Sequence, residues 1–377
     1  MRKLIDICDI QYGYAFDSAC FTEDNSYLPL VRIRDVKRGF SETFYSGEYP
    51  EEYVIHKGDL IVGMDGEFNI ARWKSIDALL NQRVCKLKAK EGTNEEYLRF
   101  ALVKALKTIE DKTAFVTVKH LSAKELNKLE LDMPGIEEQN VRAESMAKLE
   151  KVISHRKEEL SALDNLIKAR FVEMFGDPVT NEKGWNQKQL GEITTKLGSG
   201  ATPKGGKEAY QEDGITLIRS MNVHNGLFEY KELAHISEEQ ATKLDNVTIE
   251  ENDVLLNITG ASVARSCVVP SKILPARVNQ HVCIIRCNQC IVPEFLNKLL
   301  IDDNYQRLLW SIARGGATRE AITKQQVESL QIIVPPIELQ NQFADFVNQV
   351  DKSKVAVQKA LDETQMLFDS LMQEYFN

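Results

Sequence analysis

An internal repeat constrains the fold of this chain more than any other feature of its sequence. The same order of short motifs occurs twice, which is the pattern of a chain built from two copies of one unit. The matched segments are 4–7 with 190–193, 30–36 (LVRIRDV) with 217–223 (LIRSMNV), 57–62 with 251–256, 81–85 (NQRVC) with 279–283 (NQHVC), and 133–140 (MPGIEEQN) with 334–341 (VPPIELQN).

The spacing between matched segments separates variable from fixed parts of each copy. The offset grows from 186 residues at the first pair to 201 at the last, and it stays at 201 through Phe175 and Phe376. A growing offset indicates insertions in loops, whereas a constant offset indicates a segment whose length matters. Each copy is therefore predicted to be a variable globular domain followed by a tail of matched length.

The two tails have the spacing of long helices. Their apolar positions advance in alternating steps of three and four, which is the seam of a coiled coil. Prolines at 134 and 335–336 precede the tails, where proline can begin a helix but not continue one. The seam positions are Leu149, Ile153, Arg156, Leu160, Leu163, Ile167, Arg170 and Met174 in the first tail, and Val347, Val350, Lys354, Val357, Leu361, Thr364, Phe368, Leu371 and Tyr375 in the second.

A helix of about 39 residues would span roughly 58 Å at 1.5 Å per residue. We expect the two helices to pack antiparallel and to hold a globular domain at either end. A heptad pattern alone would favour a simple dimerisation zipper. The repeat of domain plus helix favours a spacer instead.

The globular halves are predicted to be mixed α/β. Short apolar runs bounded by Gly, Asn and Asp indicate strands, and two longer segments have helical spacing. The expected strands are 28–36, 59–62, 83–87, 217–223, 253–258 and 282–285, and the expected helices are 97–109 and 293–309. The predicted fold class is α+β, with two mixed α/β domains joined by two long helices packed as an antiparallel coiled coil. The predicted division is 1–136, 137–176, 177–337 and 338–377.

Composition limits where this chain works and what it binds. No stretch approaches the ~20 apolar residues of a membrane span, the N-terminal segment lacks the apolar core of a signal peptide, and seven cysteines form no regular framework. We therefore expect a cytoplasmic protein with free thiols and no membrane contact. The net charge of −9 predicts weak DNA binding by the chain alone, because phosphate neutralisation supplies most nonspecific affinity.

No motif in the chain supports chemistry of its own. Residues 200–208 (GATPKGGKE) resemble a phosphate-binding loop. Counted back from Lys207, however, the position of the loop's first glycine is Ala201, and Glu208 stands where a hydroxyl would bind magnesium. His281, Cys283, Cys287 and Cys290 are closely spaced, but a strand with buried thiols is favoured over a zinc site. We expect no catalytic residue, no metal and no cofactor on this chain.

Several segments carry a resemblance to a known family. Residues 169–185 (ARFVEMFGDPVTNEKGW) resemble the linker between the first helix and the second recognition domain of type I restriction–modification specificity subunits. Residues 197–203 (LGSGATP) and 214–219 (GITLIR) look like the start of such a recognition domain, and 332–340 (IIVPPIELQ) is similar to the entry into the spacer helix. The first copy begins differently, with 10–16 (IQYGYAF), so the two domains are expected to read different sequences.

The resemblance implies partners and a division of labour. Each recognition domain would read one half of a bipartite double-stranded DNA site, and the helices would set the spacing and dock two modification (methyltransferase) subunits. S-adenosylmethionine would be bound by those modification subunits, and ATP and magnesium by restriction (translocase/nuclease) subunits. Two alternatives stay open from the sequence: the DNA-reading subunit of another restriction system, and a coiled-coil adaptor without DNA.

Candidate DNA contacts are polar or basic side chains expected in loops, because these residue types pair with base edges and phosphates. Residues 314–319 are the preferred segment, since glycines flanked by arginines can approach a DNA backbone closely. Arg32 and Arg219 occupy matched positions and could equally form structural ion pairs. The candidates are Arg32, Arg34, Lys37, Arg38, Arg72, Lys74, Gln82 and Arg83 in the first domain, and Lys204, Arg219, Asn222, His224, Thr259, Arg265, Gln280, His281, Arg314, Thr318 and Arg319 in the second.

Overall fold

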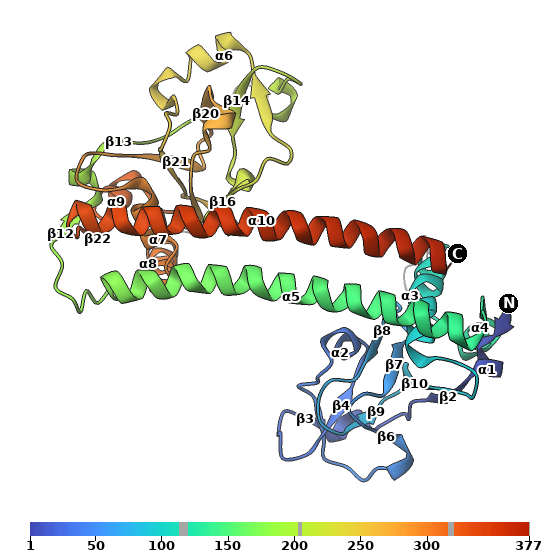
Figure 1. Cartoon of the computed structure of the whole chain (residues 1–377). Helices are drawn as coiled ribbons and strands as arrows, with labels where there is room; N and C mark the ends of the chain where they lie inside the picture. The colour runs from blue at the N-terminus through green and yellow to red at the C-terminus, as the bar shows by residue number, and fades with distance from the viewer. Residues whose placement is uncertain (113–119, 203–205, 316–319, 377) are drawn as a thin grey trace. The chain divides into compact units, whose positions relative to one another are not determined.

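The computed structural model describes residues 1–112, 120–202, 206–315 and 320–376. The chain divides into two compact units. Unit 1 consists of Met1–Glu158 and Val357–Asn377, and unit 2 consists of Glu159–Ala356. Each unit therefore combines one globular domain with part of each long helix (Figure 1).

The two predicted long helices are present as α5 (Ile136–Phe175) and α10 (Ile337–Tyr375). They pack antiparallel within each unit. In unit 1, Arg142 near the start of α5 donates to the carbonyl of Tyr375 at the end of α10, at 2.8 Å. In unit 2, the ring of Phe171 near the end of α5 lies 5.5 Å from that of Phe343 near the start of α10. All predicted seam positions are buried or half-buried.

The described part of unit 1 contains two larger sheets besides the short antiparallel pair of β1 and β11. One is antiparallel with the strand order β2-β10-β7-β8, and the other has the order β3-β5-β4-β9-β6, in which β4 and β9 are parallel. The elements of the unit are β1 (Arg2–Lys3), α1 (Leu4–Ile7), β2 (Cys8–Tyr12), β3 (Phe21–Thr22), β4 (Leu28–Val31), α2 (Ile33–Arg38), β5 (Phe44–Tyr45), β6 (Val54–Ile55), β7 (Leu60–Gly63), β8 (Ile70–Arg72), β9 (Ala78–Leu80), β10 (Val84–Ala89), α3 (Glu95–Lys112), α4 (Ala123–Lys128) and β11 (Glu130–Leu131).

Unit 2 repeats this plan. Its four-stranded antiparallel sheet has the order β13-β21-β18-β19, and a second sheet has the order β17-β14-β20 with β14 and β20 parallel. The elements are β12 (Gln187–Gln189), β13 (Thr194–Ser199), β14 (Ile215–Ile218), β15 (Val223–His224), β16 (Leu227–Phe228), β17 (Ala234–Ile236), α6 (Glu238–Thr242), β18 (Val254–Asn257), β19 (Ser266–Val268), β20 (Ala276–Val278), β21 (Val282–Cys287), α7 (Pro293–Leu300), α8 (Asp303–Arg314), α9 (Lys324–Glu328) and β22 (Gln331–Ile333).

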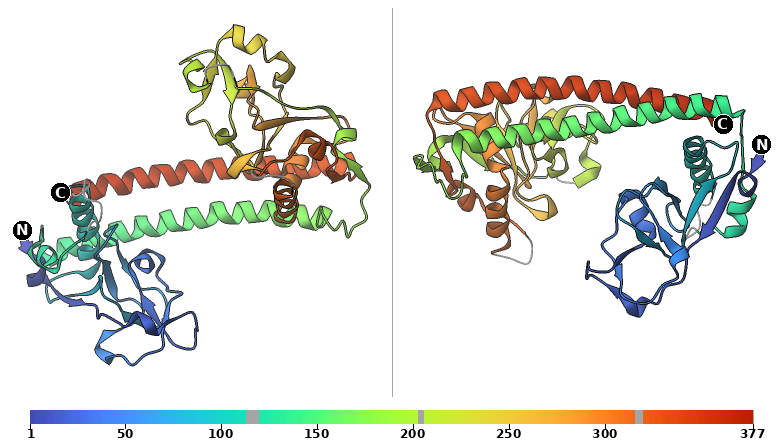
Figure 2. Two further views of the ribbon diagram at one scale, coloured as in Figure 1. Left: turned by 180° about the vertical axis from the view of Figure 1, so that it is seen from behind. Right: turned by 60° about the horizontal axis from the view of Figure 1, so that its bottom comes forward.

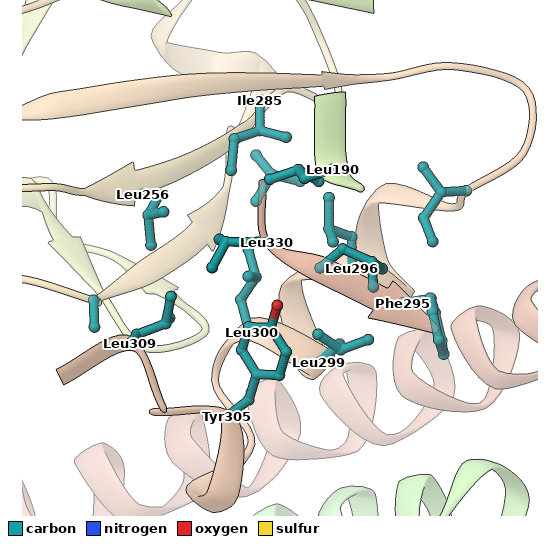
Figure 3. Close-up of a cluster of buried hydrophobic side chains, with 14 of the residues drawn as sticks. Leu190, Leu256, Ile285, Phe295, Leu296, Leu299, Leu300, Tyr305, Leu309 and Leu330 are labelled. Atoms are coloured by element: carbon teal, nitrogen blue, oxygen red, sulfur yellow. The ribbon is translucent and has the colours of Figure 1, made fainter. Parts of the chain in front are cut away.

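The largest core lies in unit 2, between the four-stranded sheet and the helices that cover it. Leu256 and Ile285 of the sheet face Leu296 and Leu299 of α7, with Tyr305 of α8 beside them (Figure 3). The same cluster includes the apolar ends of the long helices. Burying these side chains is the main stabilising term, since each fully buried large apolar side chain contributes about 1.5–3 kcal/mol.

The repeated segments 133–140 and 334–341 owe their similarity to one buried glutamine in each unit. Gln139 donates to the carbonyl of Pro134 at 2.8 Å and accepts from the backbone N–H of Asn94 at 2.9 Å. Gln340 donates to the carbonyl of Pro335 at 2.8 Å and accepts from the N–H of Val292 at 2.8 Å. Each glutamine thus joins the start of a long helix to the start of the helix that covers the sheet.

Two predicted strands end earlier than expected. Residues 28–36 form strand β4 only as far as Val31, and residues 217–223 form strand β14 only as far as Ile218. After each strand the backbone turns into a helical segment, because a side chain three residues further along the sequence caps the turn. The carboxylate of Asp35 accepts from the N–H of Arg32 at 2.9 Å, and the amide oxygen of Asn222 accepts from the N–H of Arg219 at 3.1 Å.

The predicted helix 293–309 is two helices, α7 and α8 (Figure 2). Asp302 starts the second one, since its carboxylate accepts from the backbone N–H groups of Asn304 at 2.9 Å and Tyr305 at 3.2 Å. This is the usual role of aspartate at a helix N-cap. Among the residues that the structure describes, no helix combines the length and apolarity needed to cross a membrane.

Candidate nucleic-acid interface

Each unit builds one junction of three loops at the end of a central sheet strand. In unit 1 the N–H of Met64 donates to the carbonyl of Arg83 at 2.8 Å, and the N–H of Leu121 donates to the carbonyl of Met64 at 2.7 Å. We call this place, comprising residues 64–67, 81–83 and 120–121, the unit 1 loop junction. Residues 64–67 directly follow β7, and residues 81–83 directly precede β10.

The unit 2 loop junction, residues 258–262, 279–281 and 320–322, has the same backbone connections. The N–H of Ile258 donates to the carbonyl of His281 at 2.9 Å, and the N–H of Ile322 donates to the carbonyl of Ile258 at 2.8 Å. These three residues are related to Met64, Arg83 and Leu121 of unit 1 by the same offsets as the repeated motifs. One backbone scaffold therefore occurs twice, with different side chains mounted on it.

Several predicted candidates meet at the unit 2 loop junction. Thr259, Arg265 and His281 line a shallow cavity of about 450 Å³, together with Met221 and Ser262, which the sequence did not indicate. The hydroxyl of Thr259 is hydrogen-bonded to Nδ1 of His281.

Two further candidates lie beside this cavity. His224 contacts Arg265, because its Nδ1 lies 3.4 Å from a guanidinium nitrogen of Arg265. Gln280 is exposed, with its amide nitrogen 3.2 Å from Nε2 of His281.

The unit 1 loop junction carries charged groups. Arg83 has Nε 3.5 Å from a carboxylate oxygen of Asp65 and Nη1 3.2 Å from the ring nitrogens of His120. His120 also contacts Asp65 directly. Arg83 has a φ of 72°, a left-handed conformation that is uncommon for residues other than glycine and often marks a functional position. Gln82 beside it is exposed.

The segment after β4 places four more candidates on the surface of unit 1. Arg32 and Arg34 line an open cavity of about 800 Å³. Lys37 forms an ion pair with Glu67 at 2.8 Å, and Arg38 forms one with Glu42 at 3.3 Å.

The side chain of Lys74 lies over Gly39, where a Cβ would come within 2.9 Å of it. Gly39 also has a φ of 77°, so the end of α2 favours glycine there. Lys74 itself is exposed.

Three candidates are engaged by their own unit. Arg72 pairs with Glu95 at 2.9 Å and with Glu96, and it also donates to a backbone carbonyl at 2.7 Å. Asn222 is fully buried and caps the turn after β14. Arg219 donates to the carbonyl of Glu232, with its guanidinium carbon 5.5 Å from the ring centre of Tyr210.

The end of α8 forms a small aromatic and basic surface that the sequence did not fully indicate. The guanidinium carbon of Arg314 lies 5.3 Å from the ring centre of Trp310. Trp310 and Arg314 line an open cavity of about 650 Å³, and Arg307 lines it as well. The candidates Lys204, Thr318 and Arg319 lie outside the described residues.

The two units differ in how their basic candidates are balanced. In unit 1, Lys37, Arg38 and Arg83 each have a carboxylate within ion-pair distance. Among the described residues of unit 2, Arg265 and Arg314 form no ion pair with a carboxylate. Within the described part of unit 2, these two arginines thus present their positive charge without a carboxylate counter-ion.

Two cysteines of strand β21 are shielded thiols. Burial raises the pKa of Cys283 to about 11 and that of Cys287 to about 12, so both stay protonated at neutral pH. Cys290 is exposed. Across the ranges that the structure describes, no group of three or more His, Cys, Asp or Glu side chains is arranged to hold a metal ion.

Comparisons with known proteins give a consistent result. Residues 1–164 and 182–364 match the profile of the type I restriction modification DNA specificity domain. The chain is 30% identical to the type I restriction enzyme EcoBI specificity subunit of Escherichia coli, over 98% of this chain and 84% of that protein. It is 19% identical to the MjaVIII specificity subunit of Methanocaldococcus jannaschii, over 90% of this chain and 84% of that protein.

Two solved structures share the fold. The S subunit of a type I restriction-modification system from M. genitalium superposes with a TM-score of 0.62 at 15% identity, covering all of this chain and 95% of that one. A chain from a structure describing complex assembly and conformational transition of the type I R-M system gives a TM-score of 0.54 at 17% identity, covering all of this chain and 97% of that one.

Proposed function

The chain belongs to the type I restriction–modification DNA specificity family, and from that membership we propose that each of its two units reads one half of a bipartite double-stranded DNA site. The observation that carries the proposal is the loop junction that occurs once in each unit. Its backbone hydrogen bonds are the same in both, whereas its exposed side chains differ. A fixed scaffold with variable side chains suits the reading of two different base sequences.

The contacts proposed for DNA are the candidates whose polar ends face solvent. In unit 2 these are His224, Thr259, Arg265, Gln280, His281 and Arg314, and in unit 1 they are Arg32, Arg34, Lys37, Arg38, Lys74, Gln82 and Arg83. Arg72, Arg219 and Asn222 are proposed to position the surrounding loops, because each of them already donates a hydrogen bond to a backbone carbonyl of its own unit. Lys204, Thr318 and Arg319 remain proposed contacts.

The long helices are proposed to set the spacing between the half-sites and to dock two modification subunits. The four-part division into 1–136, 137–176, 177–337 and 338–377 describes these roles. Catalysis is proposed to lie in the partners, acting in the cytoplasm. Modification subunits would bind S-adenosylmethionine, and restriction subunits would bind ATP and magnesium. The net charge of −9 supports a role for these partners in DNA binding, because contact with the DNA backbone then has to come partly from partner subunits.

The test is selection of bound duplexes from a random library by the full chain together with its modification subunits. The expected result is a motif of two short blocks separated by a fixed unread gap. Arg265→Gln should weaken preference in one block only, and Arg32→Gln in the other only. Lys57→Gln, an exposed lysine that precedes β7, serves as the control. A single continuous motif, or binding that does not depend on salt, would contradict the proposal.

A further inference from the structure

The two loop junctions differ at three positions that are matched by the repeat and by the backbone. Asp65 corresponds to Thr259, Arg83 to His281, and His120 to Ala321, at offsets of 194, 198 and 201 residues. Isolated β-bridges join Asp65 to His120 and Thr259 to Ala321, so the correspondence is structural as well as sequential. These positions present different chemistry on one scaffold.

The unit 1 set holds a guanidinium in a defined position. Asp65 faces Nε of Arg83 at 3.5 Å, and His120 faces Nη1 at 3.2 Å. The Arg83 side chain remains half exposed, while that of Asp65 is only 24% exposed. A carboxylate that fixes an arginine reduces the conformational entropy lost when that arginine binds. The remaining N–H donors can then point outward.

The unit 2 set cannot do the same. The hydroxyl of Thr259 engages Nδ1 of His281, and the amide nitrogen of Gln280 lies 3.2 Å from its Nε2, so the imidazole offers an outside partner at most that one nitrogen. The third position is Ala321, which has no polar side-chain group. A planar fork of donors matches the O6 and N7 acceptors of guanine in the major groove, whereas one imidazole nitrogen does not.

We propose that Arg83, fixed by Asp65 and His120, reads a guanine in the half-site of unit 1, and that these three positions make the two half-sites differ. The inference rests on the proposed function and adds the base and the residues that read it. Asp65 and His120 act as positioning residues, and Arg83 makes the base contact.

The experiment is duplex selection with the full chain and its modification subunits, comparing wild type with Arg83→His, Arg83→Lys and Asp65→Asn. Wild type should select guanine at one position of the unit 1 half-site. Arg83→His should reduce that preference by about 5- to 150-fold, the factor expected for one bidentate contact. The other positions of that half-site and all of the unit 2 half-site should be unchanged.

The conservative variants separate base reading from charge. Arg83→Lys keeps the charge but lacks the fork, so the guanine preference should fall while overall affinity is largely kept. Asp65→Asn, which is nearly isosteric, should lose part of the guanine preference.

The triple variant T259D/H281R/A321H places the three unit 1 side chains at the matched positions of unit 2. It should introduce guanine at the matched position of the second half-site.

Different failures have different meanings. If wild type selects a bipartite site but Arg83→His keeps the same guanine, or if no guanine occurs in the unit 1 half-site, the base assignment is overturned while the proposed function stands. If Arg83→His loses every preference of its half-site, Arg83 is structural and the assignment is again overturned. A wild type that selects no bipartite site would overturn both.

Discussion

The ring of Phe376 lies 5.0 Å from the ring of Tyr97, so the end of the second repeat completes the core of unit 1. The matched pair in unit 2 is Phe175 and Phe295, whose rings are 4.7 Å apart. Phe175 belongs to the helix of the first repeat. Each long helix therefore begins on the domain that precedes it and ends in the core of the other unit.

Replacing Phe376 with alanine should destabilise unit 1 and leave unit 2 unchanged. The side chain is 7% exposed, and loss of a buried phenylalanine ring costs about 3–5 kcal/mol. Hydrogen exchange should show faster amide exchange in α3 but not in α7. Met366→Ala is the control, because Met366 lies on the same helix and is 64% exposed. Unchanged protection of α3 would mean that the end of α10 does not stabilise unit 1.

Replacing Gln340 with leucine should lower the melting temperature of unit 2. The fully buried amide has partners at Val292, Pro335 and Cys290. Leucine is of similar size but leaves these backbone groups without a partner, and each unsatisfied group costs about 1–3 kcal/mol. Gln342→Leu, two residues further along the same helix and exposed, provides the comparison. Equal melting temperatures for the two variants would contradict the role given to Gln340.

The repeat and the helices could be predicted from sequence because both are periodic. Seam positions such as Ile153 and Val347 are buried as the three-and-four spacing predicts. The ends of the short strands could not be predicted in this way. Asp35 and Asn222 stop them through side-chain caps, which compete locally with strand pairing.

The interface could be predicted only in part. Residue type indicated Arg83, Thr259 and His281, which the loop junctions hold at matched positions. Residue type also indicated Arg72, but Glu95 and Glu96 engage it from 23 and 24 residues away. His120 was missed because backbone pairing brings it to Asp65 from 55 residues away. Its one sequence signal is the 201-residue offset to Ala321.

Replacing Glu96 with glutamine should destabilise unit 1 at neutral pH. Burial disfavours the charged carboxylate, but Arg99 and Arg72 outweigh it and hold the pKa of Glu96 below its usual value of 4.5. Because the folded-state pKa is lowered, the stabilisation is present above pH 4.5 and is lost as pH falls through the folded-state value. The expected cost is about 2 kcal/mol at pH 7.

Thermal unfolding at several pH values tests this dependence. The difference between wild type and Glu96→Gln should shrink steadily below pH 4.5. Glu91→Gln, at an exposed carboxylate close by on the chain, should match wild type throughout. A difference that persists unchanged at low pH would show that the ion pairs of Glu96 are not its source.

Alkylation of the native chain at pH 8 should modify Cys290 far faster than the buried thiols. Burial raises the pKa of Cys8 and of Cys267 to about 12, so almost no reactive thiolate forms there, and reaction would rise only at much higher pH. Mass spectrometry after a short iodoacetamide pulse measures the order of reaction. Denatured protein, in which all seven thiols should react, is the control. Comparable labelling of Cys267 in native protein would contradict its burial.

Replacing Arg314 with glutamine should weaken DNA binding without changing the selected sequence. The guanidinium of Arg314 lies over Trp310, and within the described part of the chain it has no carboxylate partner, so its charge is available to a phosphate. Loss of one phosphate contact should reduce the slope of log K against log salt by about 0.9. Titrations at several salt concentrations, with the modification subunits present, measure that slope.

Lys243→Gln is the matched control for this measurement, because Lys243 is not among the proposed DNA contacts and its charge is already balanced by Glu239 at 2.7 Å. Its salt slope should stay closer to that of wild type. Arg265→Gln should behave differently from both, since Arg265 lines the unit 2 loop junction and its loss should also relax base preference. An Arg314→Gln slope equal to that of wild type would place the end of α8 away from the phosphate backbone, and positive charge in unit 2 would then act on DNA through the loop junction.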